Sequence, residues 1–221
     1  MKQFISGVIV FFIVLAIVPA SEASYSKQAQ SYKVTITNIT RGQIISPPLV
    51  ISHSRDFRLF NLGEEAMHGL DRLAEDADTG PLTDFLATQP SVFDFKVGDG
   101  PIMPGASVSV EIKAKRGFRF LSLAGMLVTT NDAFFAVRGV RVPLFGEVVE
   151  EADAYDAGSE QNKEICDYIP GPPCGNANVH DPDPAEGYVH IHAGIHGSGD
   201  LDPSEFDWRN PVAVIVIQRI H

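Results

Sequence analysis

Alternation of apolar and polar residues is the dominant pattern along the chain. In "YKVTITNI" Val34 and Ile36 alternate with polar neighbours, and "SVSVEIKA" repeats the alternation from 107 to 114. Because successive side chains of a strand point to opposite faces, this period of two predicts half-buried antiparallel strands. Further strands are predicted for "PLVISHS", "FRFLSLAGMLVTT", "FFAVRGV", "YVHIHAGI" and "PVAVIVIQRI". The last of these is apolar on both faces, which is typical of a central strand.

One segment, residues 63–89, departs from this period. Its apolar residues Met67, Leu70, Leu73 and Ala74 have helical spacing, with acidic residues near the start, where the helix dipole favours them. A Gly-Pro pair at 80–81 predicts a division into two short helices. Strands around a single helical insertion predict an all-β, single-domain antiparallel β-sandwich, with a long irregular crossover from Glu147 to Gly187.

The chain begins with a lysine, an apolar run and a stretch of small residues, "MKQFISGVIVFFIVLAIVPASEAS". This order is typical of a secretory signal, so residues 1–23 are predicted to be a signal peptide and the mature protein to start near Ser24. The alternative is an uncleaved anchor, although the run is short for a bilayer span. Residues 24–31 are then a flexible N-terminal segment and residues 32–221 the folded domain. No later segment is apolar enough to span a membrane, which predicts a secreted or periplasmic protein.

Composition narrows the partners of such a protein. The chain has 17 basic and 28 acidic side chains, a net charge of -11, which argues against binding nucleic acid or an anionic membrane surface and favours cations. Cys166 and Cys174 lie close together in "ICDYIPGPPCG", and in an exported protein they are expected to form a disulfide. Two free buried thiols are the alternative. A zinc site is disfavoured, because it would need histidine partners from elsewhere and these cysteines lack the tight CxxC spacing usual for zinc.

Acidic residues gather in the predicted crossover. Asp156 and Glu160 are four positions apart with Gly158 between them, so a turn there would direct two carboxylates toward one point. Carboxylate oxygens are hard ligands that suit Ca²⁺. By spacing alone, a solvated acidic loop is the favoured interpretation of these residues.

Several motifs, in their order along the chain, resemble the spondin domain, the N-terminal domain family named for F-spondin, in its bacterial secreted branch. The matching stretches run from Tyr32 to the C-terminal end: "YKVTITNIT", "SPPLVISH", "LAEDADTGPL", "SLAGMLVTTNDAFFAV", "YDAGSE", "IPGPPCG", "EGYVHIHAGIHGSGDLDP" and "DWRNPVAVIVIQRI". The order "TTNDAFFAV" followed by "YDAGSE" is the most specific part of the resemblance.

The resemblance implies an eight-stranded antiparallel sandwich, C2-like in architecture, with Ca²⁺ bound at one end of the strands. It places one acidic ligand at Asp132, in "TNDAF", and two more at Asp156 and Glu160. Glu160 stands where the animal motif has aspartate, and Ala133 where it has tryptophan. Asn131 is adjacent, and either adds an amide oxygen or has a turn role.

A second candidate site is the histidine-rich stretch "YVHIHAGIHGSGDLD". In a strand, His190 and His192 share one face, and His196 follows Gly194, where the chain can turn back, so the three could share Zn²⁺ or Cu²⁺. The simpler interpretation is that His190 and His192 are hydrogen-bonded side chains that support the crossover. The spondin resemblance brings no histidine metal site with it, which favours that interpretation.

Two classes of function follow from these candidates. The first is a secreted, non-catalytic, calcium-binding module that meets an extracellular protein or glycan; on this hypothesis the protein is not an enzyme. The second is a transition-metal enzyme or metal-capture protein that uses His190, His192 and His196. The sequence has no GxSxG elbow and no HExxH helix, and Ser52, His53 and Asp56 are neighbours in sequence only.

Overall fold

The structure, a computed structural model, describes residues 28–220. The strands in this part of the chain are β1 (Gln30–Asn38), β2 (Leu49–His53), β3 (Val92–Val97), β4 (Ser107–Ala114), β5 (Phe120–Met126), β6 (Ala133–Arg141), β7 (Glu147–Asp156), β8 (His190–Ile191) and β9 (Ala213–Arg219). Every pairing among them is antiparallel. The prediction of an antiparallel all-β architecture is therefore confirmed.

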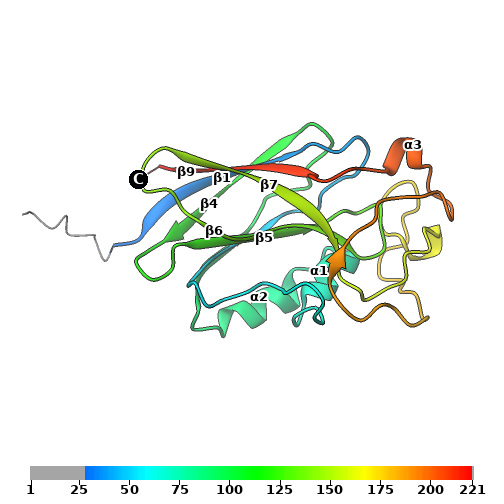
Figure 1. Cartoon of the computed structure of the whole chain (residues 1–221), viewed down its shortest axis with the longest axis horizontal. Helices are drawn as coiled ribbons and strands as arrows, with labels where there is room; N and C mark the ends of the chain where they lie inside the picture. Colours follow the sequence, from blue (N-terminus) through cyan, green and yellow to red (C-terminus); the bar gives the residue numbers. More distant parts are fainter. Residues whose placement is uncertain (1–27, 221) are drawn as a thin grey trace, which may run out of the picture.

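The strands form one sheet in the order β3-β2-β5-β6-β7-β9-β1-β4, which folds into two layers (Figure 1). Strand β7 connects the layers, because its first six residues pair with β9 and its last four pair with β6. The two outermost strands approach each other: the backbone N–H of Lys113 on β4 donates to Asp94 Oδ2 on β3 over 2.8 Å. The sheet is thus nearly closed, like a barrel.

Two strands, β3 and β7, were not expected. The sequence predicts that residue 147 begins an irregular crossover, whereas residues 147–156 form the longest strand. The reason is that the first half of β7 is mostly exposed and carries Glu147, Glu150 and Glu151. Apolar and polar residues therefore do not alternate clearly in this half of the strand. Conversely, the stretch predicted as a strand at 188–195 forms only the two-residue β8.

The core has two parts. Between the layers, side chains such as Val34, Phe135 and Ile215 are fully buried, in keeping with the predicted period of two. A second cluster lies on the outer face of β2, β5 and β6, where Leu70 and Leu82 of the helices pack against Phe134. Strand β6 is therefore apolar on both faces, because each face has a covering layer.

Two short helices provide that second covering layer. They are α1 (Leu70–Asp76) and α2 (Gly80–Ala87), and Pro81 lies in the first turn of α2, where its missing N–H needs no partner. The prediction of two short helices is confirmed, with the break at residues 77–79 and the Gly80–Pro81 pair beginning α2. The prediction of an acid near the helix start is met by Asp71 in the first turn of α1, whereas Glu64 and Glu65 precede the helix and Glu75 and Asp76 end it.

The crossover occupies residues 157–187 and lies at one end of the two layers, beside α3 (Pro203–Phe206) (Figure 1). It contains the 3-10 turn η1 (Cys166–Tyr168) and the Cys166–Cys174 disulfide, which confirms the predicted bond. Glu164, which has a positive φ of 57°, directs its carboxylate into the loop after β8. There it accepts backbone N–H groups of residues 196, 197 and 198 over 2.6, 2.7 and 2.9 Å. These bonds fasten the crossover to the loop that follows β8.

The predicted signal peptide, residues 1–23, lies outside the described residues. Strand β1 begins at Gln30, two residues before the predicted domain start at Tyr32. In residues 28–220, no helix has both the length and the apolar character needed to cross a membrane.

Candidate metal centre

The pairing of β6 with β7 brings the first two predicted calcium ligands to one edge of the sheet. Asp132 immediately precedes β6 and Asp156 is the last residue of β7, while Ala133 pairs directly with Asp156. Both aspartates are completely buried. Positions far apart in the sequence are therefore neighbours because adjacent antiparallel strands end together.

Only one of the two carboxylate oxygens of Asp132 is hydrogen-bonded. Its Oδ2 accepts three hydrogen bonds: from the backbone N–H groups of Ser159 and Glu160, over 2.9 and 3.0 Å, and from the Ser159 hydroxyl over 3.2 Å. Its Oδ1 is buried and has no hydrogen-bond partner among the described residues. A buried carboxylate oxygen without a partner is unfavourable, so this atom is a natural cation ligand.

Glu160 reaches the same region through a tight turn after β7. Gly158 has a φ of +69°, and a Cβ there would lie 2.3 Å from the carbonyl oxygen of Tyr188, so only glycine fits. Glu160 is 2% exposed. Its Oε1 accepts the backbone N–H of Asp181 over 3.1 Å and lies 3.0 Å from His180 Nδ1, whereas its Oε2 is buried without a partner.

The electrostatics of the three carboxylates favour a bound cation. Burial, followed by the charge of Asp156, raises the pKa of Asp132 well above its usual range, and the charge of Glu160 adds to this. Burial also raises the pKa of Asp156, and burial together with the charge of Glu75 raises the pKa of Glu160 to about 7. In the absence of a cation, some of these groups would have to hold protons near neutral pH.

Asp156 has more partners than the other two acids. Its Oδ1 accepts the backbone N–H of Gly158 over 2.7 Å, and its Oδ2 accepts the side-chain amide of Asn162. The Nδ1 atom of His190 lies 3.7 Å from Asp156 Oδ1. Part of the predicted histidine stretch thus borders the acidic site.

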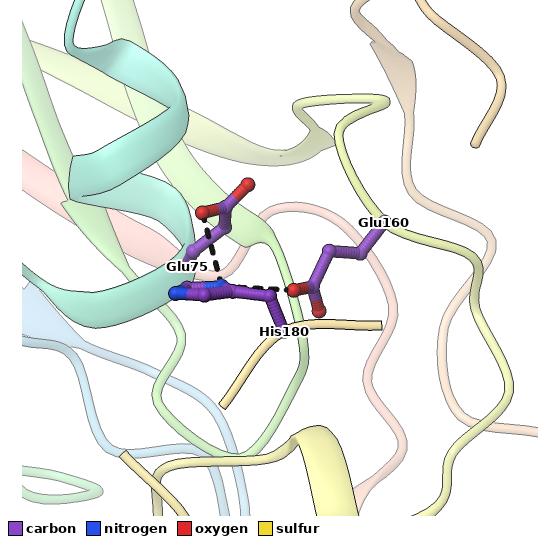
Figure 2. A group of neighbouring side chains, drawn as sticks. All are labelled: Glu75, Glu160 and His180. Carbon is purple, nitrogen blue, oxygen red and sulfur yellow. Dashed lines mark hydrogen bonds and ion pairs between the residues drawn. The ribbon is translucent and has the colours of Figure 1, made fainter. Parts of the chain in front are cut away.

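A second group of ligands adjoins the first through Glu160 (Figure 2). In residues 28–220, Glu75, Glu160 and His180 form the group whose carboxylate oxygens and imidazole nitrogen lie within 4.8 Å of one another. His180 Nδ1 is 3.3 Å from Glu75 Oε2 and 3.0 Å from Glu160 Oε1. As a set, Asp132, Asp156 and Glu160 do not bring three ligand atoms within that distance.

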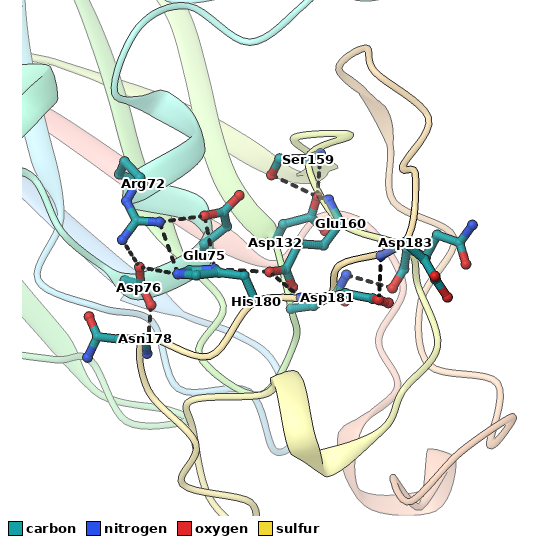
Figure 3. A network of polar contacts seen from close by, with 12 residues as sticks. Arg72, Glu75, Asp76, Asp132, Ser159, Glu160, Asn178, His180, Asp181 and Asp183 are labelled. Atoms are coloured by element: carbon teal, nitrogen blue, oxygen red, sulfur yellow. Dashed lines mark hydrogen bonds and ion pairs between the residues drawn. The ribbon is translucent and has the colours of Figure 1, made fainter.

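Arg72 determines how this second group is hydrogen-bonded (Figure 3). Its guanidinium donates to Glu75 Oε2 and to His180 Nε2, both over 3.0 Å, and also pairs with Asp76. Because a guanidinium can only donate, Nε2 must accept, and the imidazole proton is on Nδ1, directed at Glu160. The described network is therefore satisfied by a neutral His180.

A cation could replace that Nδ1 proton. The proton would then move to Nε2, which lies 3.4 Å from Asp76 Oδ2 and would donate to it, and Arg72 Nη1 would have to give up its contact with Nε2. A carboxylate behind a ligating histidine is a usual arrangement in metal sites. Two acids in the last turn of α1 are also opposed by the helix dipole, which a nearby cation would offset.

Other acids of the crossover already have cationic partners. Lys163 Nζ lies 2.9 and 2.7 Å from the two carboxylate oxygens of Asp181, and it also pairs with Asp183. By contrast, Asp132 Oδ1 and Glu160 Oε2 are buried and have neither a hydrogen bond nor an ion pair among the described residues, whereas Asp181 Oδ2 has its ion pair with Lys163. Lys163 thus neutralises Asp181 and Asp183, whereas no lysine or arginine among the described residues pairs with Asp132 or Glu160.

The three histidines of "YVHIHAGIHG" do not converge. His192 is 5% exposed and packs on Trp208, with ring centroids 4.9 Å apart, and its Nδ1 accepts the N–H of Gly194 over 3.0 Å. His196 contributes its backbone N–H to Glu164. Within the described range, His190, His192 and His196 form no group of three nitrogens within 4.8 Å. The buried Nε2 of His192 has no partner, and burial lowers the pKa of His192 to about 3.

Sequence motifs identified Asp132, Asp156 and Glu160 but missed Glu75 and His180. Glu75 lies in "LAEDADTGPL" and His180 in "NVHDPDP", and both sequences contain several acids that look equivalent. Asn131, the other residue considered, donates its side-chain N–H to the carbonyl of Gln161 over 2.9 Å, which is a loop-fastening contact.

Comparison of the sequence with models of protein families gives no match, and neither does comparison with curated proteins. The resemblance to the spondin domain therefore remains a prediction.

Proposed function

We propose that the protein is an exported, non-catalytic, calcium-binding module of the spondin type, C2-like in architecture, in which Asp132, Asp156 and Glu160 hold one Ca²⁺. The observation that carries the proposal is the pair of buried carboxylate oxygens without partners, Asp132 Oδ1 and Glu160 Oε2. Calcium accepts six to eight oxygen ligands at 2.3–2.6 Å, and backbone carbonyls and water can complete such a set.

Calcium at this position would have a mechanical role. Asp132 and Asp156 belong to the strand ends, whereas Glu160 belongs to the crossover. An ion that draws the three carboxylates together would fasten the crossover to the sheet and cancel the repulsion between them. The loops at this end of the molecule would then form an ordered surface for an extracellular protein or glycan.

Export is supported by the disulfide, because such bonds persist in oxidising compartments. A structural ion is supported by the burial of all three carboxylates, since a catalytic metal needs an open coordination position.

The proposal is tested by calcium-dependent stability. Calcium at about 100 times its dissociation constant should add about 2.7 kcal/mol to the free energy of unfolding, because only the folded state assembles the site. Asp156→Asn should lose most of this increment. Asp99→Asn is the matched control, because it removes the same charge from an exposed residue between β3 and β4. Thermal unfolding with calcium and with chelator measures the increment. An equal shift in wild type and Asp156→Asn would rule out this site.

A second candidate is supported by the compact Glu75, Glu160 and His180 group, whose mixed oxygen and nitrogen ligands suit Zn²⁺ or Mn²⁺. The two sites share Glu160 but differ in the other ligands. Asp156→Asn should reduce binding of Ca²⁺ only, His180→Gln should reduce binding of Zn²⁺ only, and Glu160→Gln should reduce both. Metal analysis of the native protein and of these three variants separates the two candidates. Stoichiometric zinc that is lost in His180→Gln, with no effect of calcium on unfolding, would favour the second.

A further inference from the structure

A cavity of about 280 Å³ lies beside the end of β6 that is opposite to Asp132. Its residues come from the end of β2 and the loop after it, from the first part of β5 and from the last part of β6. Three of them are arginines: Arg55, Arg58 and Arg138. No acidic residue lines it.

This concentration of positive charge stands out in a chain with 17 basic and 28 acidic side chains. In the part of the chain that the structure describes, none of the three arginines forms an ion pair with a carboxylate. Asp56, the acid between two of the lining residues in sequence, does not line the cavity. Three exposed guanidinium groups without countercharges form a site of positive potential that attracts anions.

Two of the arginines are held in place by neighbouring groups. Arg58 Nη1 donates to the carbonyls of Arg55 and Phe57 over 2.5 and 2.8 Å. The guanidinium carbon of Arg138 lies 4.9 Å from the centre of the Phe60 ring. Such contacts reduce the side-chain entropy that is lost on binding a ligand.

The base of the cavity is polar but internally satisfied. His53, which is 1% exposed, donates from Nδ1 to the carbonyl of Ser54 over 2.7 Å, while its Nε2 accepts the Ser122 hydroxyl over 2.8 Å. The Ser122 oxygen in turn accepts the N–H of Gly139 over 3.0 Å. Burial lowers the pKa of His53, which keeps the ring neutral. Because the Ser122 hydroxyl is 1% exposed and no carboxylate supports His53, this pair is a floor for a ligand and not a nucleophile.

The walls of the cavity are apolar. They include the aromatic rings of Phe57 and Phe120, which flank His53 at centroid distances of 4.9 and 6.3 Å, and the buried Leu59. Flat apolar walls beside charged groups suit a ligand with a ring and an anionic group. The volume lies just below the range of about 300–1,000 Å³ that is usual for small-molecule sites, which limits the ligand to about one ring.

We propose that this cavity binds a single-ring organic anion, with its carboxylate, sulfate or phosphate group at Arg55, Arg58 and Arg138 and its ring against Phe57 and Phe120. The arginine cavity, as defined by these five residues, is independent of the proposed metal centre. Binding is therefore expected both with calcium and with chelator.

The test is an NMR titration of the full chain with four probes: benzoate, benzamide, phenyl phosphate and inorganic phosphate. Benzoate should bind at least tenfold more tightly than the neutral benzamide, and phenyl phosphate at least tenfold more tightly than inorganic phosphate. Arg138→Gln should weaken binding of both ring anions at least tenfold. Lys33→Gln is the control, because it removes one charge from an exposed position on β1.

The salt dependence of binding is a second readout. Raising sodium chloride from about 50 to about 500 mM screens the exposed guanidinium groups, so the affinity for benzoate should fall more than the affinity for benzamide. Equal affinity for benzoate and benzamide, or unchanged benzoate affinity in Arg138→Gln, would overturn the anion assignment. Inorganic phosphate binding as tightly as phenyl phosphate would overturn the assignment of the ring to the aromatic walls.

Discussion

The two ends of β6 carry charge of opposite sign in opposite surroundings. Before its first residue, Asp132 is fully buried and has one oxygen without a partner. Near its last residues, Arg138 is exposed and lies beside a cavity whose polar floor is internally hydrogen-bonded.

This comparison shows that an unpaired charge affects the stability of the fold strongly when it is buried and only slightly when it is exposed. Water solvates the exposed arginines, so leaving them without countercharges has a small effect on stability. A buried carboxylate lacks this solvation and must be protonated or bound to a cation. We therefore expect changes at the metal centre to alter stability and changes at the arginine cavity to alter binding alone.

The largest expected effect comes from opening the Cys166–Cys174 bond, which lies in the crossover beside the metal centre. The double variant Cys166→Ser, Cys174→Ser should lower the free energy of unfolding by about 2 to 3 kcal/mol, because it releases the entropy restriction of a short closed loop. Urea unfolding measures the loss. Benzoate affinity at the arginine cavity should stay unchanged, and a parallel loss of that affinity would show that the two ends are not independent.

The buried His192 gives the next largest effect. Its pKa is about 3 in the folded protein, against 6.5 for an ordinary histidine, so the unfolded chain takes up a proton first as the pH falls. Stability is therefore lost as the pH decreases from 6.5 toward 3, by about 2 kcal/mol at pH 5. His192→Gln cannot titrate, and comparison of urea unfolding at pH 7 and pH 5 isolates the contribution. If wild type and His192→Gln lose equal stability, the buried ring is not the cause.

His190 and His192 also test the histidine metal hypothesis. Replacing both by glutamine should lower stability without removing a bound transition metal, because glutamine retains hydrogen-bonding capacity but ligates zinc poorly. Metal analysis beside thermal unfolding measures both. Stoichiometric zinc in the wild type that disappears in the double variant would support the metal-capture alternative.

An effect comparable to that of His192 is expected from Glu160 in the absence of metal. Its pKa is raised to about 7, so the folded protein retains a proton that the unfolded chain releases above pH 4.5. The stability of the metal-free protein should thus fall as the pH rises from 4.5 through 7, relative to Glu160→Gln. Thermal unfolding in chelator at pH 5 and pH 7.5 measures the difference. Calcium should reverse this trend in the wild type, because its ligands must be ionised.

The smallest effect on stability is expected at the arginine cavity. Arg138→Gln should change the free energy of unfolding by about 1 kcal/mol or less, since it removes the contacts of an exposed guanidinium with the rings of Phe60 and Tyr155. Urea unfolding of this variant, beside its benzoate titration, completes the contrast. A loss comparable to that of the disulfide variant would mean that Arg138 is a structural residue.

Local patterns were sufficient to predict much of the fold. Alternation identified β1 and β4, an apolar run identified β9, and the Gly-Pro pair identified the presence of two helices, α1 and α2. Strand β7 was missed because its exposed half carries acids on a face that no other layer covers. Periodicity reports burial, and a strand that is mostly exposed over half its length gives little periodic signal.

By itself, the sequence determined which segments alternate, where the helices divide, which cysteines are close enough to bond, and which motif acids to examine. Tertiary structure alone decided that Glu75 and His180 join Glu160, that His192 packs on Trp208, and that three arginines surround one cavity. The physical reason is the distance along the sequence between the residues that determine each feature. Side-chain periodicity and short loops depend on neighbouring residues, whereas burial, missing hydrogen-bond partners and convergence of charges depend on the pairing of strands that are distant in the sequence.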